Sequence, residues 1–68
     1  MVILSIFYLD MNGGGKKWST DPMPVNDAMD RVMRFCASGV DVITHNDSGR
    51  MDVLLIHRVT GMTITPVG

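Results

Sequence analysis

The apolar positions along this chain follow the period of strands first, then that of a helix, then that of strands again. Residues 2–11 form a nearly unbroken run of β-branched and aromatic side chains and predict a strand that ends at the glycines after Asn12. Residues 16–20 predict a short returning strand, because Pro22 and Pro24 cannot donate to a ladder. We therefore expect a β-hairpin whose polar second arm lies at a sheet edge.

A helical period begins at Val25 and predicts a helix over Val25–Ser38. At about 100° per residue, one stripe is apolar and consists of Val25, Ala28, Met29, Val32 and Cys36, flanked by Met33 and Phe35. The other side carries two acid-first pairs in the favourable i,i+4 order, Asp27–Arg31 and Asp30–Arg34. Gly39 is well placed to end this helix.

Three more strands are predicted after Gly39, over residues 40–45, 51–58 and 62–65, with turns at residues 46–49 and at Thr60-Gly61. We expect these strands to form an antiparallel meander. The element order is β-β-α-β-β-β, which predicts the α+β class with a single amphipathic helix packed on one face of a four- to five-stranded antiparallel sheet. A length of 68 residues allows one small domain, residues 1–68.

Two of the predicted strands are apolar on both faces. The first strand places Leu4 and Ile6 on one side and Ile3 and Phe7 on the other, and residues 53–56 repeat the pattern. One helix covers only one face, so the second face is expected to meet a partner or a second copy of the chain. The alternative is that long loops and the arm carrying Trp18 fold over the back of the sheet.

The composition excludes several protein classes. Hydrophobic residues make up 46% of the chain, and 6 basic against 7 acidic side chains give a net charge of −1, which disfavours disorder. A single cysteine, Cys36, excludes a disulfide framework and is typical of a reducing compartment, so we expect a cytoplasmic protein. The apolar run at residues 2–9 is far shorter than the roughly 20 residues of a membrane span, so no membrane association is expected.

No arrangement of residues predicts catalysis or a bound cofactor. The glycines and lysines of residues 13–17 depart from the phosphate-binding loop pattern, because Trp18 follows them where a helix is required. His45 and His57 are expected about 20 Å apart on adjacent strands and cannot share a metal ion. Cys36 belongs to the apolar helix face, so a Cys-His nucleophile is not supported. We expect no enzyme activity, no cofactor and no metal.

Protein binding is the function class that the sequence favours, since an apolar, methionine-rich surplus and a tryptophan at a mobile hairpin are typical of small recognition modules. The side chains expected to contact a protein partner are Tyr8, Lys16, Lys17, Trp18, Arg50 and Arg58. Trp18 is either an interface anchor or a plug at the edge of the core. The alternative function is a homodimeric regulatory protein that contacts nucleic acid through Lys16, Lys17 and Trp18, although the balanced charge disfavours nucleic acid.

The chain begins with Met1 at a strand, continues through a hairpin ending at Trp18 and a proline-led helix over Val25–Ser38, and closes with a meander over residues 40–65. In size and layout it resembles small phage-encoded inhibitors, including anti-CRISPR proteins and phage inhibitors of host RNA polymerase. The resemblance implies a non-enzymatic protein that blocks a host or CRISPR effector complex by occupying its functional surface.

Overall fold

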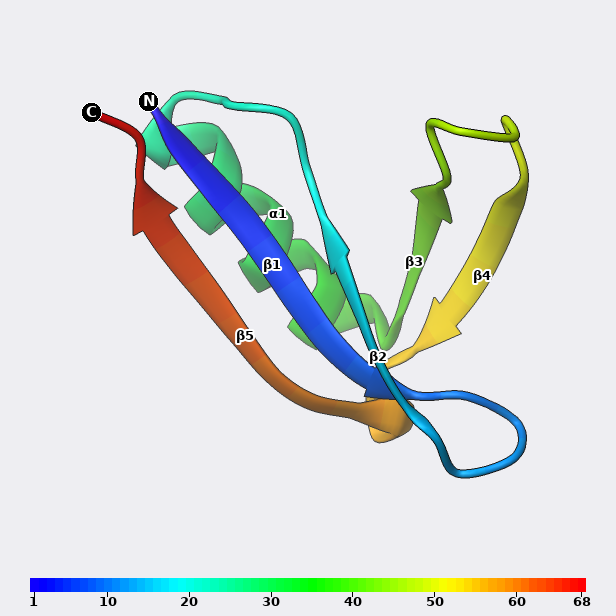
Figure 1. The fold of residues 1–68 in the computed structure, drawn as a ribbon. Coiled ribbons are helices and arrows are strands. Elements are labelled where there is room, and N and C mark those ends of the chain that lie inside the picture. The colour runs from blue at the N-terminus through cyan, green and yellow to red at the C-terminus, as the bar shows by residue number, and fades with distance from the viewer.

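The computed structural model describes residues 1–68 and contains five strands, one α-helix and one short 3-10 turn (Figure 1). In chain order the elements are β1 (Val2–Leu9), β2 (Gly15–Ser19), α1 (Val25–Ser38), β3 (Val40–Thr44), β4 (Met51–Leu55), η1 (Ile56–Arg58) and β5 (Val59–Pro66). The α+β class and the order β-β-α-β-β-β are confirmed. The helix has the predicted bounds, and Gly39 ends it in the left-handed conformation at φ 79°, its N–H donating to the carbonyl oxygen of Phe35.

The strands form two antiparallel sheets, so the prediction of one four- to five-stranded sheet is wrong. One sheet has the order β2-β1-β5, and the other consists of β3 and β4. The predicted C-terminal meander is also wrong, because the chain makes the η1 turn after Leu55 instead of continuing β4. The turn leads β5 back to β1, where Ile6 faces Met62 and Val2 faces Pro66. The dipeptide Thr60-Gly61, expected to form a turn, lies inside β5.

The core lies between α1 and one face of the three-stranded sheet, and α1 is seen behind that sheet in Figure 1. Alternate residues of β1 supply one side of it, and its buried members are Val2, Leu4, Ile6, Ala28, Phe35, Ile43 and Leu54. The buried stripe of the helix is rotated from the predicted one. Phe35 is buried, whereas Cys36 is exposed and Met29 is 52% exposed. We attribute the rotation to Phe35, the largest apolar side chain of the helix, which buries the most area when it faces the sheet.

The other face of the three-stranded sheet is mixed in character. The register places Ile3 opposite Thr65 and Phe7 opposite Lys17, so polar neighbours interrupt the second apolar row of β1. Between them the hydroxyls of Ser5 and Ser19 share a hydrogen bond of 2.8 Å. This face is therefore polar enough to remain in water without a cover.

The β3–β4 hairpin carries the larger apolar excess. Its inner row packs on the core through Ile43 and Leu54, while its outer row is exposed. The cross-strand pairs of that outer row are Val40 with Leu55, Val42 with Val53, and Thr44 with Met51. The five apolar side chains among them are between 38% and 68% exposed. No loop of the chain covers these side chains, in contrast to the expected alternative of loops folded over the sheet.

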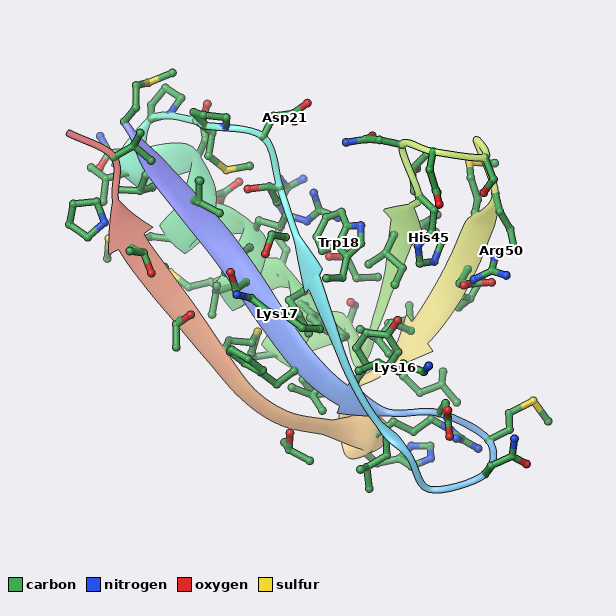
Figure 2. The ribbon with its side chains drawn as sticks, viewed as in Figure 1. Lys16, Lys17, Trp18, Asp21, His45 and Arg50 are labelled. Atoms are coloured by element: carbon green, nitrogen blue, oxygen red, sulfur yellow. The ribbon has the colours of Figure 1, made fainter.

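Trp18 of β2, labelled in Figure 2, and Arg31 of α1 join the two sheets through hydrogen bonds to β3. The Trp18 Nε1–H donates to the carbonyl oxygen of Thr44 at 3.0 Å, and the Arg31 Nη2 donates to that of Val42 at 3.0 Å. The Arg31 Nε also lies 2.9 Å from the Asp41 carboxylate, and its guanidinium lies over the Trp18 ring, 4.9 Å from the centroid. These contacts fix β3 beside β2 and occupy the outer edge of β3 with side chains.

Candidate partner-binding groove

A groove of about 640 Å³ lies between the end of the β1–β2 hairpin and the β3–β4 hairpin. One wall consists of residues 8–11 with Lys16 and Lys17, and the other consists mainly of Arg50 and residues 52–55. Arg58 completes it from η1. A volume of this size is typical of ligand sites. The groove exists because η1 separates β4 from β5 and leaves the two hairpins as opposite walls.

Asp10 organises the turn that forms one end of this groove. Its Oδ1 accepts hydrogen bonds from the backbone N–H groups of Asn12 at 2.9 Å and Gly14 at 2.7 Å. A Cβ at Gly14 would lie 3.0 Å from Asp10 Oδ2, a tight contact that glycine avoids. The same carboxylate lies 3.9 Å from Lys16 Nζ, and its main-chain carbonyl accepts from Arg58 Nη1 at 3.1 Å.

The pKa of Asp10 is lowered from its ordinary value of 3.8. The main cause is the hydrogen bond from the backbone N–H of Gly14, which is stronger to the ionised carboxylate than to the neutral carboxyl group, and partial desolvation opposes it. The N–H of Asn12 and the positive charges of Lys16 and Arg58 lower the pKa further. Asp10 therefore stays ionised to a lower pH than an ordinary aspartate, and its carboxylate holds the turn through these hydrogen bonds.

The opposite wall holds a second charged cluster at the turn of the β3–β4 hairpin. Asp52 Oδ2 lies 2.9 Å from His45 Nε2 and 3.3 Å from Arg50 Nη2. The backbone N–H of His45 donates to the carbonyl of Arg50 at 2.8 Å and closes the hairpin. Asp52 is thus paired inside the groove wall, and Arg50, with a side chain 67% exposed, extends its charge toward solvent.

The groove carries more positive than negative charge. Six charged residues border it, namely Lys16, Lys17, Arg50, Arg58, Asp10 and Asp52, and without Lys17 three cationic side chains still face two anionic ones. Arg58 and Lys17 have no carboxylate within salt-bridge distance. Lys17 projects to the far face of the β1–β2 ladder, where its ammonium lies 5.7 Å from the centroid of the Phe7 ring. Lys16 and Lys17 are therefore neighbours in sequence with opposite orientations.

Four of the six side chains predicted to contact a partner line this one groove: Tyr8, Lys16, Arg50 and Arg58. Lys17 borders the groove, but its side chain lies on the far face beside Phe7. Trp18 lies outside it, beside a smaller cavity of about 320 Å³ between β2 and β3. It is half-buried, packs against the core and donates to Thr44, which favours its interpretation as a plug at the edge of the core.

The sequence did not indicate three of the residues that line the groove, namely Asp10, Asp52 and Val53. The signal for the last was the alternation of Met51, Val53 and Leu55, which marks one face of a strand but not whether that face is covered. The contact of Asp52 with His45 depends on the register of the hairpin, which no local signal in the sequence specifies.

The two histidines have different surroundings. His45 pairs with Asp52, and His57 is exposed in the η1 turn. No group of three or more histidine, cysteine or acidic side chains is arranged to hold a metal ion. The helix of 14 residues is neither long enough nor apolar enough to cross a membrane.

No protein family model, curated protein or solved structure matches this chain.

Proposed function

We propose that this protein is a non-enzymatic protein-binding module and that a protein partner docks in the groove between the β1–β2 and β3–β4 hairpins. The observation that carries the proposal is the convergence of Lys16, Arg50 and Arg58 with the apolar side chains of Leu9 and Met11 around one groove. An apolar centre with charged surroundings is typical of recognition surfaces, and the charge excess favours an acidic partner surface.

The resemblance to small phage-encoded inhibitors adds a role to this proposal. The bound partner is then a host protein or a CRISPR effector, and binding blocks the functional surface of that partner. The proposal also places the protein in the cytoplasm, where the single exposed thiol of Cys36 stays reduced.

A homodimeric regulatory protein with nucleic-acid contact is the second candidate, because Lys16, Arg50 and Arg58 gather on one side of the molecule. Two features weigh against it. Asp10 and Asp52 lie among these cations and would face the phosphates, and Trp18 is held by Thr44 and Arg31 instead of being free to stack on a base.

The test compares the wild-type protein with Lys16→Glu and Lys17→Glu, two charge reversals at adjacent residues of opposite orientation. Each is immobilised and exposed to a lysate of the cells in which the protein is naturally produced. We expect a partner that is retained by the wild type and by Lys17→Glu and released by Lys16→Glu. Equal retention by all three proteins would contradict docking in the groove.

The second candidate is measured in parallel with fluorescent single-stranded and duplex DNA. Binding by phosphate contacts falls steeply between 50 and 200 mM salt, by about 10³-fold or more for six contacts. DNA binding that falls steeply with salt and is lost in Lys16→Glu would show that the partner is a nucleic acid and not a protein.

A further inference from the structure

β4 has a free backbone edge. The hydrogen bonds from the His45 N–H to the Arg50 carbonyl and from the Ile56 N–H to the Gly39 carbonyl mark hydrogen-bonded pairs at both ends of the β3–β4 ladder. Because such pairs alternate in an antiparallel ladder, the N–H and C=O groups of Met51, Val53 and Leu55 point away from β3. Leu55 is the N-cap of η1, so its carbonyl oxygen accepts the first hydrogen bond of that turn. No hydrogen bond of a turn, cap or side chain uses the N–H and C=O groups of Met51 and Val53 or the N–H of Leu55.

β4 has few of the devices that protect edge strands from pairing. The corresponding edge of β3 is occupied, since Arg31 and Trp18 donate to the carbonyls of Val42 and Thr44. β4 contains no proline. Its one charged residue, Asp52, is an inward-pointing charge of the protective kind, but Arg50 and His45 neutralise it within the chain. An exposed apolar edge with so few protective devices is prone to pair with another chain.

The side chains around this edge define what an added strand would meet. On the outer side lie Met51 and Val53, each 68% exposed, and Leu55, 38% exposed. On the inner side, Asp52 and Leu54 line the groove that also holds Lys16 and Arg58. An added strand therefore meets apolar side chains on one face and cations on the other.

We propose that an extended acidic peptide segment of the partner adds as a strand to the free edge of β4. This inference rests on the proposed protein-binding function and names the chemistry of the partner. The segment alternates apolar side chains, which pack beside Met51, Val53 and Leu55, with acidic side chains, which face Lys16 and Arg58. The main-chain hydrogen bonds supply affinity along a strand of about 17 Å, the length of five residues.

A second copy of the chain fits less well. Paired with itself, β4 would bring one carboxylate, Asp52, which is already neutralised by Arg50 in its own chain, and would leave Arg58 without an anion. The charge excess of the groove therefore selects an acidic segment.

The test uses a seven-residue peptide of alternating glutamate and valine, blocked at both ends, added to the isotope-labelled protein. We expect the amides of Met51, Val53 and Leu55 to exchange with solvent rapidly in the free protein and at least about 10-fold more slowly with saturating peptide, as they become hydrogen-bonded. Two control peptides should bind at least about 10-fold more weakly. One has lysine in place of glutamate, and the other has proline at its centre, which removes a ladder donor.

Two variants locate the binding on the protein. Val53→Asp places a negative charge on the exposed outer row and should weaken the peptide about 10-fold without unfolding the hairpin, because this side chain is 68% exposed. Thr63→Asp makes the same change of charge on the open face of the other sheet and should leave the affinity unchanged. Dispersed amide spectra of both variants verify the fold.

The outcomes separate this inference from the proposed function. Retention of a cellular partner that depends on Lys16, without protection of the β4 amides by the peptide, overturns strand addition and leaves the protein-binding function standing. Equal binding of the proline peptide likewise overturns it. If the β4 amides are already protected from exchange in the free protein and the protein sediments as a dimer, a second copy of the chain occupies the edge. That result also overturns the proposal of an acidic segment.

Discussion

Replacing Arg31 by methionine should loosen the junction between the two sheets. Methionine keeps the apolar stem and removes three contacts of the guanidinium: the ion pair with Asp41 at 2.9 Å, the hydrogen bond to the Val42 carbonyl at 3.0 Å and the stacking over Trp18 at 4.9 Å. The ion pair is sheltered, with side-chain exposures of 27% for Arg31 and 20% for Asp41.

The magnitude follows from these contacts. A hydrogen bond to a charged group contributes about 1.5–3 kcal/mol, while cation–π contacts and half-exposed ion pairs add about 0.5–1 kcal/mol each and overlap with it. We expect a loss of about 2 kcal/mol, out of a total stability on the order of 3–10 kcal/mol for a domain of this size. With a urea dependence of about 1 kcal/mol per molar, the unfolding midpoint should fall by about 2 M.

The assay is urea unfolding followed by the fluorescence of the single tryptophan, Trp18, which lies at this junction. Arg34→Met is the matched control on the same helix, because its ion pair with Asp30 is i,i+4 and more than half exposed on both sides, and it should lower the midpoint by less than about 0.5 M. In a double-mutant cycle, Arg31→Met and Asp41→Asn should couple by about 1 kcal/mol. Equal midpoints for Arg31→Met and Arg34→Met would refute the role of Arg31.

Three further perturbations test other parts of the structure. Phe35→Ala removes the largest buried side chain of the core, 2% exposed, and should lower the stability by about 3–5 kcal/mol. Most or all of the cooperative thermal transition should then be lost. Met33→Ala is the control, because Met33 is 68% exposed, and it should leave the thermal transition nearly unchanged. Gly39→Ala should cost about 1–2 kcal/mol in urea unfolding because φ is 79° there, whereas the added Cβ meets Ile56 only at an ordinary 3.6 Å; a variant as stable as wild type would contradict the helix end described above. The Asp10 carboxyl should titrate in a carbon-detected NMR experiment with a pKa below 3.8. Because this pKa is lowered in the folded state, the stability that ionised Asp10 contributes is fully present above pH 3.8 and disappears as the pH falls through the folded pKa. A midpoint at or above 3.8, or a difference in stability between wild type and Asp10→Asn that does not shrink at lower pH, would refute the hydrogen bonding of the turn.

The local elements could be predicted because their signals lie within a few residues. The helix over Val25–Ser38 follows from its period and from Gly39, and the two hairpins follow from strand runs separated by turn residues. The same local signals misled at two places. Residues 56–58 continue the apolar pattern of β4 but form η1, and Thr60-Gly61 has turn residues but lies in β5. In both cases the pairing of β5 with β1, whose partners lie between 51 (Tyr8 and Val59) and 64 (Val2 and Pro66) residues apart in sequence, overrides the local preference.

The candidate site shows the same division. Tyr8, Lys16, Arg50 and Arg58 were predicted as separate side chains on hairpins and turns, and nothing in their spacing places them around one groove. The sequence also predicted an apolar excess without locating it. On the open face of the three-stranded sheet, hydroxyl side chains lie among the apolar ones, while the outer face of the β3–β4 hairpin exposes mainly apolar side chains.

By itself, the sequence of this protein determined which segments are strands and helix and that one helix could not cover all the apolar residues, because side-chain periodicity and burial energy act locally and additively. Only the tertiary structure decided that the strands divide into two sheets, that a groove opens between them and that β4 is left with a free edge. Those features depend on which strand edges meet, and that choice is made by the combined burial of Leu4, Ile6 and Phe35 with the distant β5, in competition with the pairing of neighbouring strands.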